Sequence, residues 1–135
     1  MVALSLGAAW IGTRDSVMHM ITVTPFRPSS ASDLASLRGA TAWLNSEPLT
    51  AAALQGRVVL IDFWTYTCIN WLRTVPYVRA WAARYKEQGV VVIGVHTPEF
   101  LFERNVENVR RSVQQMPIDY PVVIGNDHAI WRAVN

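Results

Sequence analysis

The hydrophobic pattern of the chain changes its period near residue 65. A near-continuous apolar run from Val58 to Phe63 predicts a strand that is buried on both faces of a parallel sheet. The polar turn Thr65–Thr67 follows it, and Thr67 is the expected N-cap of a helix that reaches about Glu87. The apolar residues of this helix recur at intervals of three and four, which predicts that one face packs on the sheet: Leu72, Val75, Val78, Ala82 and Tyr85.

A second strand and a second helix follow. Gly89 should end the first helix, and Val90–Val95 repeats the apolar run, so that strand, helix and strand form a βαβ unit with parallel strands. A second helix is expected near residues 102–116, with Glu107 and Arg111 paired on its outer side. Its apolar stripe consists of Phe102, Val106, Val109, Val113 and Met116.

The pattern also predicts shorter elements on both sides of this unit. A short strand is expected at Ala42–Leu44, and Thr50 should cap a short helix, residues 51–55, that ends at Gly56. Tyr120–Ile124 should be a third strand, and Asp127 the cap of a last helix that runs through residue 131.

Residues 1–40 are expected to precede the folded domain, which should occupy residues 41–135. Met1–Gly12 is mostly apolar, but a spanning helix needs about 20 such residues and a signal peptide needs a basic start. This segment is therefore either the end of a longer membrane anchor or an irregular stretch. Thr22–Leu37 is rich in Pro and Ser and indicates a flexible linker.

The composition fits one globular α/β domain. The chain has 135 residues, 51% of them hydrophobic and 16% charged, which is enough for a buried core and too apolar for a disordered chain. The formal net charge is +2, and the basic residues are scattered, so no nucleic-acid partner is expected. His19 and His128 stand too far apart in the sequence to suggest a metal site, and no phosphate-binding loop or Ser-His-Asp spacing is present. We therefore expect no metal and no cofactor.

The chain contains a single cysteine, Cys68. If Thr67 caps the helix, Cys68 lies in the first helical turn, where free N–H groups and the positive end of the dipole favour a thiolate. A single thiol closes no intramolecular disulfide, and it also leaves the redox compartment undecided. Cys68 is thus the candidate nucleophile.

The residues around this cysteine resemble a known family. Asp62-Phe63-Trp64, followed by Cys68 and Pro76, is similar to the active-site segment of thioredoxins, in which a strand ending Asp-Phe-Trp precedes Cys-x-x-Cys and a helix-kinking proline. Segments 64–70 and 94–100 are more similar to the redoxin or TlpA-like branch of extracytoplasmic thioredoxin-like proteins, which includes domains attached to disulfide-transport membrane proteins. The resemblance begins near residue 41 and implies an α/β thioredoxin-like fold with a leading hairpin. Trp71 stands where the family has its second cysteine.

The resemblance also assigns roles to residues near Cys68. It implies that Asp62 is a buried carboxylate serving the second cysteine; since Trp71 occupies that position, a structural carboxylate is the alternative. Trp64 either shapes the substrate surface or packs in the core. Trp71 either shields a mixed disulfide or fills space, and we favour the second interpretation. Pro76 is expected to kink the helix.

His96 follows the second strand, at the carboxyl edge of the sheet where sites gather. A packing role is favoured over catalysis for this residue. A family domain would also continue with a cis-proline loop, a hairpin and a final helix, none of which has a counterpart before Asn135. We therefore expect a truncated domain with one open sheet edge, reduced stability and a tendency to associate.

Three functions remain open. The first is thiol-disulfide exchange through Cys68 alone, with protein thiols or disulfides as partners and an external thiol such as glutathione to resolve the mixed disulfide. The second is a one-cysteine peroxidase; Thr65 matches the Thr that precedes the peroxiredoxin cysteine, whereas Ile61 stands where that family has Pro. The third is a non-enzymatic binding module. The resemblance implies an extracytoplasmic, periplasmic location, with a membrane tether as one option.

Overall fold

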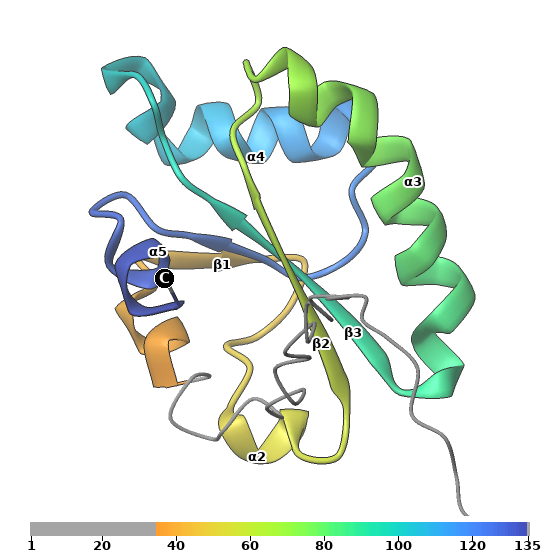
Figure 1. Cartoon of the computed structure of the whole chain (residues 1–135). Helices are drawn as coiled ribbons and strands as arrows, with labels where there is room; N and C mark the ends of the chain where they lie inside the picture. The colour runs from red at the N-terminus through yellow and green to blue at the C-terminus, as the bar shows by residue number, and fades with distance from the viewer. Residues whose placement is uncertain (1–34, 135) are drawn as a thin grey trace, which may run out of the picture.

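The computed structural model describes residues 35–134 (Figure 1). Predictions for Met1–Gly12 and for most of the linker therefore lie outside the described residues. The domain boundary at residue 41 stays a prediction, although Leu37 is buried and packs against the domain. In chain order the elements are η1 (Ala35–Gly39), β1 (Ala42–Leu44), α2 (Ala51–Leu54), β2 (Val58–Trp64), α3 (Ile69–Tyr85), η2 (Lys86–Gln88), β3 (Val90–His96), η3 (Leu101–Arg104), α4 (Val106–Gln115), β4 (Val122–Ile124) and α5 (Ala129–Val134).

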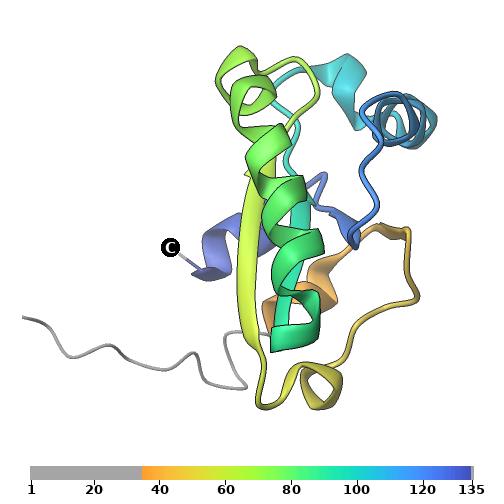
Figure 2. The same cartoon turned by 90° about the vertical axis from the view of Figure 1, so that its right-hand side faces the viewer.

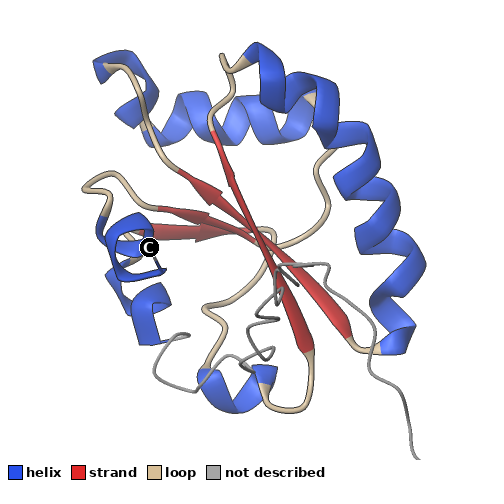
Figure 3. Cartoon of the chain, viewed as in Figure 1, coloured by secondary structure: helices blue, strands red, loops and turns tan. Residues whose placement is uncertain are grey.

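The four strands form one mixed sheet in the order β1-β4-β3-β2 (Figure 3). β2 and β3 are parallel over their whole length, from the pair Val58–Val90 to the pair Trp64–His96, and β4 is parallel to β3. The predicted βαβ unit is confirmed. The prediction of a leading hairpin is wrong, because β1 pairs antiparallel with β4 at the far side of the sheet.

β2 lies at an edge of the sheet. The expectation that it is buried on both faces is wrong: Val58 is exposed, the next five residues are half-buried, and only Trp64 is buried. Within residues 35–134, β2 has β3 as its single neighbour, so solvent reaches its outer side. The strand that is buried along most of its length is β3.

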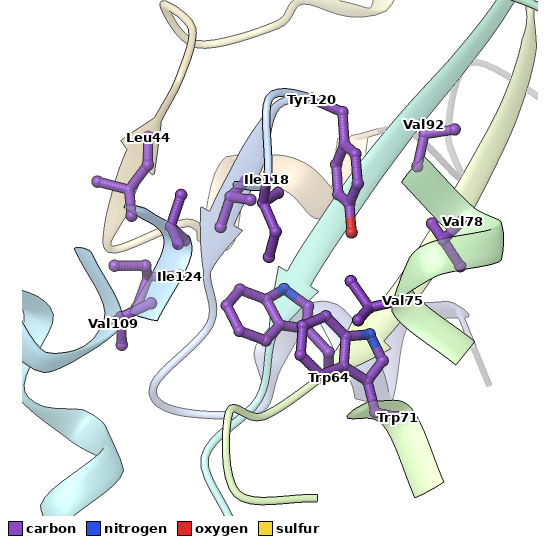
Figure 4. Close-up of a cluster of buried hydrophobic side chains, with 12 residues drawn as sticks. Leu44, Trp64, Trp71, Val75, Val78, Val92, Val109, Ile118, Tyr120 and Ile124 are labelled. Carbon is purple, nitrogen blue, oxygen red and sulfur yellow. The ribbon is translucent and has the colours of Figure 1, made fainter. Parts of the chain in front are cut away.

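Successive side chains of a strand point to opposite faces of the sheet, so the buried residues form a core on each face. Figure 2 shows α3 on one side of the strands and α5 on the other. The α3 and α4 side holds the larger cluster, whose buried members are Leu44, Trp64, Trp71, Val75, Val78, Val92, Val109, Val113, Ile118, Tyr120, Val122 and Ile124 (Figure 4). The opposite side packs under η1, α2 and α5 and contains Leu37, Leu54, Ile93, Val95, Val123 and Ile130.

The face of helix α3 that packs on the sheet is the predicted one. Val75 and Val78 are buried, and the helix contains Pro76. It ends two residues before the predicted limit, and after η2 the chain turns at Gly89, whose φ of +84° is readily adopted by glycine.

Helix α4 begins later than predicted. The side chain of Asn105 accepts hydrogen bonds from the N–H groups of Glu107 and Asn108 and starts the helix after it. Phe102 therefore lies in η3 and is 55% exposed, contrary to its predicted place on the apolar stripe. The ion pair on the outer side is Glu107 with Arg110, not with Arg111, at 3.6 Å.

Thr50 caps α2 as predicted, whereas Asp127 lies one residue before His128, the N-cap position of α5, and bonds to the helix start from there. The hydroxyl of Thr50 accepts a hydrogen bond from the N–H of Ala53, at 3.2 Å, at the start of α2. The carboxylate of Asp127 accepts one from Ala129 at the start of α5, at 3.0 Å. None of the helices between residues 35 and 134 is long and apolar enough to cross a membrane.

Candidate active site around Cys68

Cys68 is the N-cap residue of α3, so the helix begins one residue later than predicted. Its backbone is extended, with φ −71° and ψ 107°, and its carbonyl accepts the first helical hydrogen bond from Leu72 at 2.9 Å. Thr67 is not the cap, because its hydroxyl donates to the carboxylate of Glu103 instead. The half-buried side chain of Cys68 makes no capping hydrogen bond of its own. The thiol is therefore at the helix end where backbone N–H groups are free, as the redox interpretation requires.

Cys68 opens into a groove of about 330 Å³ at the carboxyl edge of the strands. Three of the predicted site residues, Trp64, Thr65 and Trp71, line this groove with it. The structure adds residues from other elements: Phe63, Thr97, Glu99, His128 and Trp131. The ring of Phe63 meets that of Trp131 edge-on, with centroids 4.7 Å apart. The walls of the groove are thus largely aromatic.

Trp71 packs as part of the core. It is only 5% exposed, and its ring stacks on that of Trp64 with centroids 4.5 Å apart and an interplanar angle of 23°. Figure 4 shows the two indoles beneath Val75 and Tyr120. The arrangement supports the space-filling interpretation, although the edge of Trp71 also borders the groove.

Asp62 is hydrogen-bonded to the residue that replaces the second cysteine. The indole N–H of Trp71 donates to its carboxylate at 2.9 Å. Burial raises the pKa of Asp62, and the hydrogen bond from Trp71 opposes this shift. The carboxylate therefore has a fixed donor inside the chain, which supports the structural alternative for Asp62.

His96 does not line the groove. It is fully buried, with its ring edge-on to Trp64 at 5.2 Å and stacked near Tyr66 at 5.9 Å. Neither ring nitrogen has a hydrogen-bond partner among the described residues. Burial lowers the pKa of His96 to about 4, against the opposing charge of Glu103, so the ring is neutral at pH 7. Pro76 likewise lies away from the groove, on an exposed part of α3.

The sequence did not identify Glu103 as a site residue. Glu103 is fully buried beside the turn that leads to Cys68, and it accepts hydrogen bonds from the hydroxyl of Thr67 and from the N–H groups of Glu99 and Phe100. A glutamate at the third position of a short helix, as in a capping box, was the available signal. In residues 35–134, no three His, Cys, Asp or Glu side chains are grouped to hold a metal ion.

Comparisons with known proteins show what the chain as a whole is similar to. No family model matches the chain. Over 98 residues it is 46% identical to Protein DipZ of Mycobacterium bovis, an alignment that covers 70% of this chain and 14% of DipZ. Thiol-disulfide oxidoreductase YkuV of Bacillus subtilis is 27% identical over 97 residues, which cover 72% of this chain and 65% of YkuV. A solution structure of a thioredoxin-like protein in the oxidized form superposes with a TM-score of 0.62 and 28% identity, covering 69% of this chain and 62% of the other. The chain thus spans about a seventh of the length of DipZ.

Proposed function

Because the chain belongs to the thioredoxin-like family, in the redoxin or TlpA-like branch of thiol-disulfide oxidoreductases, we propose that it exchanges disulfides with other proteins through Cys68. The observation that carries this proposal is the position of Cys68, the N-cap of α3 at the edge of an open groove. Backbone N–H groups at that end of the helix stabilise a negative charge, and the groove gives a second sulfur access to the thiol.

The exchange proceeds in two steps. The Cys68 thiolate attacks one sulfur of a partner disulfide; the new S–S bond joins Cys68 to that sulfur, and the other partner sulfur leaves as a thiolate that takes a proton. An external thiol, such as glutathione or a free cysteine of the partner, then attacks the mixed disulfide and releases Cys68. After this step the external thiol is joined by a disulfide to the first partner sulfur, and a second external thiol displaces that sulfur. Two electrons thus pass to the partner disulfide from two external thiols, which end as their own disulfide, and Cys68 ends unchanged.

The surface around the groove favours a protein as the partner. The groove walls are aromatic, and next to Glu99 the chain exposes three consecutive apolar side chains of η3 and its cap. Phe100, Leu101 and Phe102 are 54%, 80% and 55% exposed. Apolar patches beside a reactive group are typical of protein contact sites.

A binding module without exchange activity is the second candidate, and one observation favours it. Trp71 occupies the position of the resolving cysteine and satisfies Asp62 with its indole N–H, so the dithiol machinery of the family is replaced by a packed contact. In that case the groove binds a partner but Cys68 forms no mixed disulfide with it.

Turnover with a small disulfide separates the two candidates. Reduced protein is incubated with hydroxyethyl disulfide and glutathione, and consumption of glutathione is followed beside the Cys68→Ser variant. Exchange activity predicts turnover that requires Cys68, with a mixed disulfide of one glutathione per chain visible in the intact mass. Equal background rates for both proteins would reject exchange and leave the binding module.

An extracytoplasmic location is part of the same proposal and rests on the TlpA-like relationship. In intact cells that express the chain, a membrane-impermeant maleimide should label Cys68 without lysis. Labelling only after lysis would place the protein in the cytoplasm and contradict this part of the proposal.

A further inference from the structure

Glu103 is a buried carboxylate without a cationic partner among the ion pairs of residues 35–134. Burial by itself would raise the pKa of Glu103, but the side chains of Thr65 and Thr67 and the amides of Phe100 and Glu99 together outweigh this and lower it. The group is therefore ionised at neutral pH. A buried charge costs free energy unless it is fully hydrogen-bonded, so the hydrogen bonds of the Glu103 carboxylate are what allow the charge to be buried.

Those contacts join two loops that follow neighbouring parallel strands. One carboxylate oxygen accepts from the hydroxyl of Thr67, in the turn between β2 and α3. The other accepts from the N–H groups of Glu99, at 2.7 Å, and Phe100, at 2.9 Å, in the loop after β3. Glu103 thus bridges the residue next to Cys68 to a loop whose Glu99 lines the same groove as the thiol.

Two further hydrogen bonds hold the same turn. The hydroxyl of Tyr66 donates to the carbonyl of Phe102 at 3.2 Å, and the N–H of Cys68 donates to the carbonyl of Thr65 at 3.2 Å. Cys68 contributes no side-chain hydrogen bond of its own. The position of its sulfur therefore depends on how firmly its neighbours fix the turn.

We propose that Glu103 is a positioning residue, which acts through Thr67 to hold the Cys68 thiol at the N-terminal end of α3. The inference rests on the proposed function, for which the thiolate at this helix end is the nucleophile. When the link to Thr67 is absent, the turn gains freedom, and the sulfur spends less time beside the free N–H groups that stabilise its charge.

Two substitutions of Thr67 test the link directly. Thr67→Val removes the hydroxyl and keeps the shape, the carboxylate and both loop hydrogen bonds, whereas Thr67→Ser keeps the hydroxyl. Thr67 is exposed, so both variants should fold. Ser112→Ala is the matched control, since it removes a hydroxyl that bonds to the Asn108 carbonyl in α4, away from the groove.

The readout is the rate of Cys68 alkylation by iodoacetamide between pH 6 and pH 10. At pH 7, Thr67→Val should react about three- to tenfold more slowly than the wild type. At pH 10, above the free-thiol pKa of about 8.5, the rates should converge. Thr67→Ser and Ser112→Ala should stay within about twofold of the wild type at every pH, as expected for variants that keep the link.

Glu103→Gln separates the link from the charge. The side-chain oxygen of the glutamine still accepts hydrogen bonds from the amides of Glu99 and Phe100. Its NH₂ group donates to the hydroxyl of Thr67, which becomes the acceptor of this bond. The other ionisable groups around the thiol are unchanged: Glu99 and His128 in the groove, Asp62 bonded to Trp71, and the stacked pair Tyr66 and His96. Because a negative charge is removed, this variant should react at least as fast as the wild type at pH 7.

Other results would overturn the inference. If Thr67→Val reacts like the wild type at every pH, the link does not position the thiol. If it is slower by one constant factor up to pH 10, the hydroxyl controls access and not the stability of the thiolate. These outcomes differ from failure of the proposed function, in which Cys68 alkylates normally but gives no turnover with hydroxyethyl disulfide.

Discussion

Replacing Trp71 by Phe removes one hydrogen bond from the interior and leaves a ring in its place. The bond lost is the one that the indole N–H donates to the Asp62 carboxylate at 2.9 Å. A hydrogen bond to a charged group contributes about 1.5–3 kcal/mol, and the smaller ring also loses part of the stack on Trp64. The pKa of Asp62, already raised by burial, rises further without this donor, so protonation relieves part of the penalty. We expect a net loss of about 2 kcal/mol in the free energy of unfolding at pH 7.

A double-mutant cycle isolates the contact. Urea denaturation is followed by far-UV circular dichroism for the wild type, Trp71→Phe, Asp62→Asn and the double variant. The coupling between the two positions should be about 1–2 kcal/mol. Trp81→Phe is the control on the same helix, since Trp81 is 47% exposed, and it should cost less than about 0.5 kcal/mol.

Two results would refute this reasoning. A coupling below about 0.3 kcal/mol would mean that Trp71 does not satisfy Asp62 in solution. Equal stability of Trp71→Phe and Trp81→Phe would mean that Trp71 is not part of the packed core.

Three further predictions concern the same cluster and its surroundings. Burial lowers the pKa of His96 from 6.5 to about 4, so between these two pH values the unfolded chain binds a proton that the folded state does not. The free energy of unfolding is therefore unaffected above pH 6.5. Below it, this free energy falls by up to about 1.4 kcal/mol per pH unit until about pH 4. His96→Phe should make this acid loss shallower in urea midpoints at pH 7.5, 5.5 and 4.5, and an unchanged slope would contradict it. Gly94→Ala places a Cβ 3.0 Å from Trp64 Nε1 and from Tyr120 Cε2, so thermal denaturation should reveal a loss of about 1–3 kcal/mol; a neutral effect would show that the cluster has room. Trp71→Cys restores the Cys-x-x-Cys spacing and should reduce insulin with dithiothreitol, below its own unfolding temperature, faster than Cys68→Ser does; equal rates would indicate that the second cysteine is not the missing part.

The central βαβ unit was predictable because its signals are local. Apolar runs mark β2 and β3, and three- and four-residue spacing marks the buried face of α3. The same pattern does not report which strand lies beside which, so it placed β2 inside the sheet when it is at the edge. It also did not show that β1 crosses the sheet to pair with β4.

The site was predictable to within one residue at Cys68, and the error has a physical cause. Thr67 has the side chain of an N-cap, but Glu103, 36 residues away in the sequence, accepts its hydrogen bond. A contact of this range leaves no periodic signal. Sequence spacing also left two interpretations of Trp71, which its stacking on Trp64 and its bond to Asp62 distinguish.

The reactivity of the single thiol tests the account most directly. Reduced protein is mixed with 5,5′-dithiobis(2-nitrobenzoate) at pH 7, and the second-order rate is compared with that of N-acetylcysteine, with circular dichroism to show that α3 is folded. A thiol held at the end of α3 beside free N–H groups should form the mixed disulfide about tenfold faster than the free amino acid. A rate equal to or below that of N-acetylcysteine, with the helix intact, would contradict the redox function.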